Sequence, residues 1–264
     1  MAQKVLMCRP DYFGIEYEIN PWMDKACQPN KFQAKKQWNR LVEVYKSLGV
    51  VVEFIDPVAG LPDMVFTANA GLVYENQIIL SNFRPKPRRG EKPFFKKWFS
   101  EHGYVWRTLP EGLFFEGPGD VLSVGEKLVC GYGIRSSKGG VIEAARMAGR
   151  EAVLLKLVDK NYYHLDTCFC HLKNEILFYP PAFDNDSVKK IESLGEAIPV
   201  SEADAMRFVC NAVPIYKNGR KLITTPMSKK LKMRLEKYDI EPIETNLSEF
   251  LKSGGAARCL TLFI

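Results

Sequence analysis

Two stretches of this chain share one pattern, DMVFTANAGLV at 63–73 and LFFEGPGDVLSV at 113–124. In each, an apolar run enters a short polar motif and continues into a second apolar run. After a polar turn, the first stretch reaches IIL at 78–80 and the second reaches LVCG at 128–131. Apolar runs joined by turns rich in Asn, Gly, Glu and Lys are typical of β-hairpins. We therefore predict a hairpin after each polar motif.

The pattern returns at intervals of about 50 residues, which indicates a repeat architecture. Three further copies read YHLDTCFCHL at 163–172, RFVCNAVPI at 207–215 with a turn at 217–220, and GAARCLTLFI at 255–264. The last copy has no following strand. The apolar run VLMC at 5–8 could supply one from the other end of the chain.

Helical patterns lie between the hairpins. Asn30 can cap a helix over 31–48, whose apolar face includes Leu41 and Tyr45 and which Gly49 would end. Further helices are expected at 93–102, 138–148, 187–194, 228–238 and 247–252, and short β-like runs follow at 50–55 and 152–157. Repeats that cannot bury their own faces must pack on their neighbours. We therefore predict a single α/β domain over residues 1–264, in which five hairpin-helix-strand units close into a ring.

The composition excludes several classes of protein. The 264 residues carry 37 Lys and Arg against 31 Asp and Glu, a net charge of +6, and 46% are hydrophobic. This is ordinary for a globular protein and excludes disorder. No apolar run approaches the roughly 20 residues that cross a bilayer, and the N-terminus does not resemble a signal peptide, so no membrane partner is expected. The basic stretch at 84–97 is broken by Glu91 and by prolines, which favours a solvated loop leading into a helix and no nucleic-acid partner.

Seven cysteines, an odd number with no regular framework, are expected to be reduced thiols in a cytoplasmic protein. The sequence leaves open whether the chain forms a homo-oligomer.

A ring would point the polar motifs of all units at its centre. The motifs contribute Asp63, Asn69, Glu116, Asp120, His164, Asp166, Asn211 and Cys259. A cysteine, a histidine and several carboxylates in one cavity are the ingredients of thiol nucleophilic catalysis, and the carboxylates would suit a cationic substrate. No cofactor is needed, because the thiol is the nucleophile and the histidine moves protons. The usual zinc spacings are missing around His164, Cys168 and Cys170, so no metal is expected.

Each of these residues also has a structural explanation. A buried cysteine is more often a small hydrophobe than a nucleophile, and a lone histidine in a strand is usually structural. Asp63 could be a helix cap or an ion-pair partner as well as a substrate ligand. Asp120 could simply close a glycine-rich turn, and Asn211 is expected to be structural.

Three motifs in order carry a resemblance that covers essentially the whole chain. The motifs are FEG and GD at 115–120, HLDT at 164–167, and GG at 254–255 followed by Cys259. On these motifs the sequence resembles the guanidino-group-modifying penteins. These are arginine deiminases, dimethylarginine dimethylaminohydrolases and amidinotransferases. The resemblance implies a five-bladed α/β propeller that hydrolyses a guanidino group through a covalent thiouronium intermediate.

The resemblance also implies roles for individual residues. Cys259 would attack the guanidinium carbon, and His164 would give a proton to the departing ammonia and then activate water. Glu116 would orient the histidine, and Asp166 would hold guanidinium nitrogens. Arg89 and Arg135 match positions that bind the substrate carboxylate.

One departure favours a subgroup. Where the family commonly has Asp, this chain has Asn69, and an amide can donate a hydrogen bond as well as accept one. A donor suits the urea oxygen of citrulline, so the site could retain citrulline and attack it again. Together with Asn20 in INPWM at 19–23, this resembles the arginine dihydrolases, which convert L-arginine to L-ornithine, carbon dioxide and two ammonia molecules.

The alternatives are an arginine deiminase that stops at citrulline, a dimethylarginine dimethylaminohydrolase, an amidinotransferase, and a non-catalytic propeller of the same fold.

Overall fold

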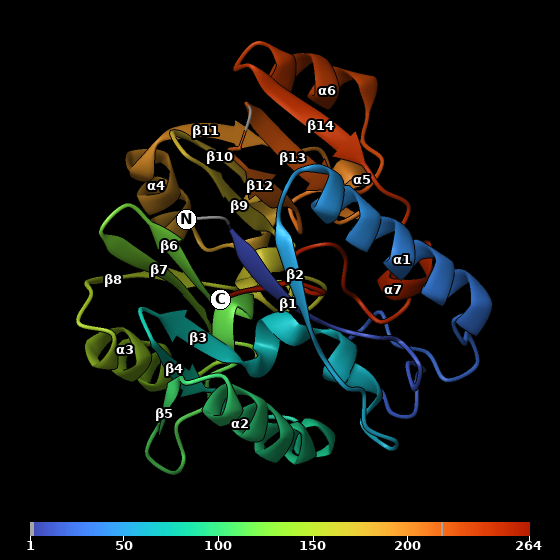
Figure 1. The fold of residues 1–264 in the computed structure, drawn as a ribbon. Coiled ribbons are helices and arrows are strands. Elements are labelled where there is room, and N and C mark those ends of the chain that lie inside the picture. The colour runs from blue at the N-terminus through green and yellow to red at the C-terminus, as the bar shows by residue number, and fades with distance from the viewer. Residues whose placement is uncertain (1–2, 218) are drawn as a thin grey trace.

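A computed structural model describes residues 3–217 and 219–264 and shows five three-stranded sheets arranged around the middle of the molecule (Figure 1). The sheets are β3–β4–β5 (Gly71–Tyr74, Gln77–Leu80, Val105–Thr108), β6–β7–β8 (Val121–Val124, Lys127–Tyr132, Ala152–Lys156), β9–β10–β11 (Phe169–Leu172, Glu175–Phe178, Glu196–Pro199), β12–β13–β14 (Val213–Ile215, Arg220–Thr224, Ile240–Glu244) and β15–β1–β2 (Leu262–Phe263, Lys4–Cys8, Val51–Ile55). In each, the middle strand pairs antiparallel with one neighbour and parallel with the other. The predicted repeat of hairpin, helix and strand is therefore confirmed. Residues 1–2, at the start of the predicted domain, and residue 218, in the predicted turn at 217–220, lie outside the described residues.

The fifth sheet is built from both ends of the chain. Val5 in β1 pairs with Phe263 of β15 on one side and with Val52 of β2 on the other. The Thr67 hydroxyl ties this sheet to the first unit, because Oγ1 lies 2.9 Å from the Leu6 carbonyl and 3.1 Å from the Leu260 carbonyl. The prediction that residues 5–8 complete the last unit is confirmed.

The longer helices lie on the outside of the sheets in Figure 1. They are α1 (Lys31–Ser47), α2 (Lys92–Glu101), α3 (Lys138–Met147), α4 (Asn185–Leu194) and α6 (Lys229–Glu236), with two short helices, α5 (Glu202–Ala205) and α7 (Ser248–Leu251). Asn30 caps α1 as predicted, accepting from the Gln33 amide at 3.0 Å. All six predicted helices are present, and α5 is an addition that the sequence pattern did not indicate. The apolar face of α1, including Leu41 and Tyr45, packs in one buried cluster with Val5 and Met7 of β1.

Short 3-10 helices lie between the units and, in the case of η3 and η6, between the middle strand and the helix of one unit. They are η1 (Pro62–Val65), η2 (Thr67–Ala70), η3 (Lys86–Glu91), η4 (Gly117–Gly119), η5 (Leu165–Thr167) and η6 (Pro180–Ala182). Three of them, η2, η4 and η5, hold the polar motifs immediately before β3, β6 and β9.

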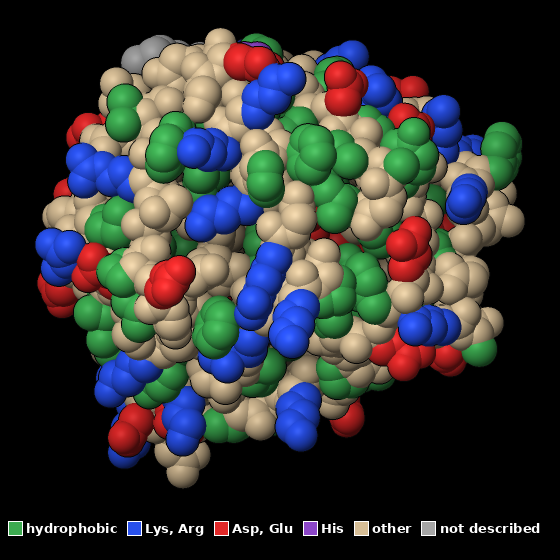
Figure 2. Space-filling model, turned by 90° about the horizontal axis from the view of Figure 1, so that it is seen from below, with side chains coloured by type: hydrophobic (Ala, Val, Ile, Leu, Met, Phe, Trp, Pro, Cys, Tyr) green, Lys and Arg blue, Asp and Glu red, His purple; other side chains and the backbone are tan. Residues whose placement is uncertain are grey.

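The basic stretch at 84–97 forms η3 and the first part of α2. The helix is as predicted, but the expected solvated loop is wrong in part, because residues 86–91 form a 3-10 helix in which Arg88 and Glu91 are buried by their mutual ion pair and by packing on the cluster of polar turns. Figure 2 looks onto this side of the molecule and shows Lys and Arg side chains across the middle of the face, with Asp and Glu among and around them. No helix in the described part of the chain has both the length and the apolar character that a membrane crossing requires.

Candidate active site

Each of the five units contributes one polar residue to a common buried cluster. The residue sits in the turn that leads into the first strand of the hairpin, or into β15 in the last unit, and the set is Asn69, Glu116, Asp166, Asn211 and Cys259. Hydrogen bonds join the turns across units. The Asn69 amide donates to the Glu116 carbonyl at 3.0 Å, and the Asn211 amide donates to the Asp166 carbonyl at 3.0 Å. The repeat thus delivers chemically different side chains to one place.

Cys259 is buried, with 2% of its surface exposed. Its Sγ lies 3.4 Å from Asp166 Oδ2 and accepts from Asn211 Nδ2 at 3.1 Å. Burial, followed by the neighbouring Asp166 carboxylate, raises the pKa of the Cys259 thiol well above its ordinary value. The thiol is therefore protonated at neutral pH until a cation enters beside it.

Asn211 holds the backbone as well as the sulfur of Cys259. Its Oδ1 accepts from the backbone N–H groups of Ala256 at 2.9 Å and Cys259 at 3.1 Å. The expectation that Asn211 is structural fits these two backbone hydrogen bonds, and the contact between its amide and the thiol was not predicted. Its place in the repeat, one unit before the cysteine, was the available signal.

Asp166 is fully buried. Burial raises the pKa of its carboxyl to about 7, although the Arg258 charge and the hydrogen bonds from Cys259 and Asn211 act in the opposite direction. Asp166 Oδ1 has no hydrogen-bond partner among the described residues. A buried oxygen without a partner costs about 1–3 kcal/mol, so the site favours a ligand that brings an N–H donor here.

His164, Glu116 and Arg135 form a buried hydrogen-bonded chain. His164 Nε2 and Arg135 Nη1 each lie 2.8 Å from Glu116 Oε2. Burial alone would raise the pKa of Glu116, but the Arg135 charge and the contact with His164 lower it well below its ordinary value. Glu116 is thus a carboxylate held between the guanidinium of Arg135 and the imidazole of His164. The other imidazole nitrogen, Nδ1, is buried with no partner among the described residues.

Gly119 allows this arrangement. A Cβ at this position would stand 2.4 Å from Asn69 Nδ2, closer than real Cβ atoms approach, and 3.1 Å from His164 Nδ1, a tight contact. The glycine in the GPGD motif therefore keeps the space between two candidate site residues open.

Arg88, which the sequence analysis did not single out, reaches the cluster. It is 3% exposed, donates through Nη1 to Asn69 Oδ1 at 2.8 Å, and makes two hydrogen bonds to Glu91 at 2.7 and 2.9 Å. Its neighbour Arg89 is exposed, and its guanidinium donates to the Phe83 and Arg84 carbonyls at 3.1 Å each. Arg89 therefore lies outside the buried cluster, while the role predicted for it stays a prediction.

Asp63 lies on the same side of the cluster as Arg88. Its Oδ2 accepts from the Tyr17 hydroxyl at 3.1 Å, and its Oδ1 is buried without a partner among the described residues. Burial raises the pKa of Asp63 in spite of the nearby Arg88 charge. The ion-pair role and the ligand role considered for Asp63 are both compatible with this position.

The segment between β1 and α1 covers the cluster. Arg135 Nη2 donates to the Ile19 carbonyl at 3.1 Å, and Asn20 Nδ2 donates to the Ser253 carbonyl at 3.1 Å. Trp22 Nε1 donates to the Asn161 carbonyl at 2.7 Å. Asn20 thus sits at the rim of the cluster, where it links the covering segment to the turn before Cys259.

The arrangement can bind a planar cation and attack it with sulfur. Partnerless oxygens on Asp63 and Asp166 offer acceptors, Cys259 offers the nucleophile, and the His164–Glu116 pair offers proton transfer. Within residues 3–217 and 219–264, no group of three or more His, Cys, Asp or Glu side chains is placed to hold a metal ion.

Five repeated α/β units around a buried thiol, with a histidine-carboxylate pair beside it, define a pentein of the guanidino-modifying class. The sequence matches the family described as N,N dimethylarginine dimethylhydrolase, eukaryotic, over residues 9–264, and the chain belongs to that family.

Relatives in this family include two kinds of named enzyme. The bifunctional arginine dihydrolase/ornithine cyclodeaminase ArgZ of Synechocystis is 44% identical over 266 residues, covering 98% of this chain and 37% of the relative. The N(G),N(G)-dimethylarginine dimethylaminohydrolase of Mycobacterium tuberculosis is 37% identical over 265 residues, covering 100% of this chain and 86% of the relative. The chain thus spans little more than a third of the bifunctional relative.

Among solved structures, the N-terminal domain of ArgZ bound to substrate superposes with a TM-score of 0.94 at 43% identity, covering 99% of this chain and 97% of that chain.

Proposed function

We propose that this chain is a cysteine-dependent hydrolase of the guanidino group of L-arginine, an arginine dihydrolase that forms L-ornithine, carbon dioxide and two ammonia molecules. The observation that carries the proposal is the buried thiol of Cys259 against Asp166, with His164 held by Glu116 in the same cluster. The identity to a relative named as an arginine dihydrolase supports the choice of substrate.

The first step is binding. The substrate guanidinium donates N–H groups to Asp166 and Asp63, whose buried oxygens lack partners among the described residues. Its positive charge lowers the pKa of the Cys259 thiol, whose raised value comes from burial and from Asp166. The substrate itself therefore helps to generate the nucleophile. Because the segment 17–22 covers the cluster, it must move for the substrate to enter.

The chemistry then proceeds by two displacements at one carbon. The Cys259 thiol passes its proton to His164 as its sulfur bonds to the guanidinium carbon. A C–N bond then breaks as His164 gives this proton to the leaving ammonia, which produces a thiouronium. Water, deprotonated by His164, adds to the same carbon, the C–S bond breaks, and citrulline and the free thiol result. A second round on the ureido carbon consumes another water and gives ornithine, ammonia and carbon dioxide.

Asn69 is the residue we assign to the second round. Its Oδ1 accepts from Arg88 at 2.8 Å and its Nδ2 donates to the Glu116 carbonyl at 3.0 Å, so one of its two N–H groups remains to meet a ureido oxygen. In Asn69→Asp, a carboxylate keeps the Arg88 contact but can offer no donor.

Product analysis by mass spectrometry tests the proposal. We expect ornithine from L-arginine with the wild-type chain and none with Cys259→Ser. Asn69→Asp should release mainly citrulline, whereas Asn76→Asp, the same change at an exposed hairpin turn, should behave as wild type. Citrulline alone from wild type would make the chain a deiminase. Turnover of dimethylarginine alone would favour the reaction named for the mycobacterial relative, and undiminished turnover by Cys259→Ser would overturn the mechanism.

The remaining structural expectations are part of this proposal. We propose that the five sheets close into a propeller and that residues 1–264 fold as one domain, supported by the pairing of β1 with β15. Arg135 and Arg89 remain the proposed ligands of the substrate carboxylate. Arg88, which donates a hydrogen bond to Asn69, is the alternative to Arg89 as a ligand of the substrate carboxylate. The cytoplasmic location and the formation of a homo-oligomer stay predictions.

A further inference from the structure

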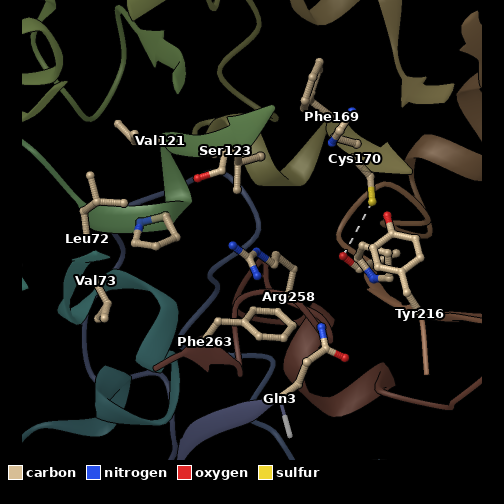
Figure 3. Close-up of a pocket in the computed structure, with 15 residues that line it drawn as sticks. Gln3, Leu72, Val73, Val121, Ser123, Phe169, Cys170, Tyr216, Arg258 and Phe263 are labelled. Atoms are coloured by element: carbon tan, nitrogen blue, oxygen red, sulfur yellow. Dashed lines mark hydrogen bonds between the residues drawn. The ribbon is translucent and has the colours of Figure 1, made fainter. Parts of the chain in front are cut away.

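A second cavity lies behind the candidate active site. Its volume is about 310 Å³, and every sheet contributes to its wall (Figure 3). The first strand of each hairpin, and β15 in the last sheet, supply Leu72, Ser123, Phe169, Pro214 and Phe263. The site residues precede these same strands in the turns, so the cavity and the cluster lie on opposite sides of one layer of turns.

Among the described residues that line the cavity, Arg258 carries the one charge that is fixed at neutral pH. The fifteen lining residues include this one arginine, no lysine and no acidic side chain. In Figure 3 the Arg258 guanidinium points into the open space between the strands. It lies 5.3 Å from the Phe263 ring, and it makes no side-chain hydrogen bond or ion pair within residues 3–217 and 219–264. A half-buried guanidinium with no acceptor favours an anionic partner.

The walls select the kind of anion. One guanidinium matches a carboxylate, which it can hold with two parallel hydrogen bonds, whereas a phosphate dianion would need further positive charge. The surrounding side chains, among them Leu72, Val121 and Phe169, are apolar, and the Tyr216 hydroxyl adds a polar group. The exposed Ser123 hydroxyl already accepts a hydrogen bond from Arg150, outside the lining, at 2.7 Å. The cavity volume lies near the lower limit of ligand-pocket volumes, so it suits a small, compact ligand.

We propose that this cavity binds a small monocarboxylate with a flat apolar body, held by Arg258, and that its occupation weakens the binding of substrate in the active site. The second part rests on the proposed function, whereas the first does not.

The coupling follows from the place of Arg258 in the chain. It directly precedes Cys259, and its charge is the strongest influence that keeps Asp166 ionised against burial. A carboxylate on Arg258 would cancel that charge, so Asp166 would hold its proton more tightly and bind a guanidinium less well. By linkage, substrate must weaken the carboxylate by the same factor.

Binding is tested by titrating the full chain with benzoate and with benzamide, its uncharged analogue, by isothermal calorimetry. We expect benzoate to bind and benzamide to bind at least tenfold more weakly. Arg258→Gln should lose at least tenfold in benzoate affinity and Arg258→Lys less. Arg40→Gln, which removes the same charge from an exposed site on α1, should bind as wild type. Equal binding of benzoate by wild type and Arg258→Gln would overturn the proposal.

Two further measurements locate the site and test the coupling. Ser123→Phe, which fills the mouth of the cavity, should abolish benzoate binding, and Ser193→Phe on exposed α4 should not. In Cys259→Ser saturated with L-arginine, the benzoate Kd should rise a few-fold and reach a plateau. A rise without limit would mean that benzoate competes in the active site and would overturn the proposal. If the benzoate Kd is the same with and without bound arginine, the proposed coupling is overturned, whereas the carboxylate site at Arg258 is supported. If arginine does not bind at all, the proposed function fails while Arg258-dependent benzoate binding still stands.

Discussion

Asp166 couples acid-base chemistry to substrate binding at the level of a single side chain. Because burial raises its pKa to about 7, the free enzyme loses the carboxylate needed for a guanidinium as the pH falls through that value. We expect kcat/KM for L-arginine to fall about tenfold per pH unit below about pH 7, since kcat/KM reports the free enzyme. Bound substrate favours the charged form, so the acid limb of kcat should lie at lower pH.

The control for this profile is Asp120→Asn. Burial raises the pKa of Asp120 to about 6, but its oxygens accept from the backbone of Leu165 and Ser136. If Asp120→Asn loses the fall of kcat/KM at acid pH, that fall belongs to Asp120 and not to Asp166. A flat pH profile in the wild-type chain would contradict the role of Asp166.

Asn211 offers a test of the thiol environment. In Asn211→Asp, a carboxylate would replace the amide that lies 3.1 Å from Cys259 Sγ, so the thiol pKa should rise further. A shift of one pKa unit makes the thiolate about tenfold scarcer. We expect alkylation of Cys259 by iodoacetamide at pH 8 to slow by about this factor, measured by intact mass. Asn246→Asp, at an exposed cap, should react at the wild-type rate.

At the scale of elements, two side-chain N-caps, Asn30 on α1 and Ser137 on α3, differ in the number of groups that they bind. Asn30 accepts one hydrogen bond from α1 near the surface. Ser137 caps α3 and also exchanges hydrogen bonds with the backbone N–H and carbonyl of Phe114. We expect Asn30→Ala to lower the free energy of unfolding by about 1 kcal/mol and Ser137→Ala by about 2 kcal/mol. Urea denaturation measures both, and equal losses would show that the Phe114 contacts add nothing.

The sequence predicted these elements well because hairpin and helix signals are local. Apolar periodicity and caps placed every predicted helix within two residues at each end. The turns were harder. In η3, whether Arg88 or Arg89 faces the cluster depends on the phase of one 3-10 turn, and no apolar pattern marks that phase. Asn211 was undervalued for a similar reason, because its two contacts with Cys259 depend on the packing of separate units.

At the scale of the whole molecule, the joined ends predict cooperative unfolding. Thr67 Oγ1 reaches the backbone carbonyls of Leu6 and Leu260, so it fastens both ends to the first unit. We expect Thr67→Val to lower the free energy of unfolding by about 1–3 kcal/mol, with fluorescence and circular dichroism still reporting one coincident transition. Thr108→Val on the exposed strand β5 is the control. Two separated transitions would contradict a single domain.

The pairing of β1 with β15 also orders events on the ribosome. Residues 4–8 are made well before their antiparallel partner at 262–263, which follows after tens of seconds of synthesis at about 5–20 residues per second. Until then, β1 carries one open edge made of apolar residues, a surface prone to pair with other chains. The nucleophile, Cys259, is translated just before that edge closes. A nascent chain therefore gains its proposed nucleophile and pairs the open edge of β1 at nearly the same moment.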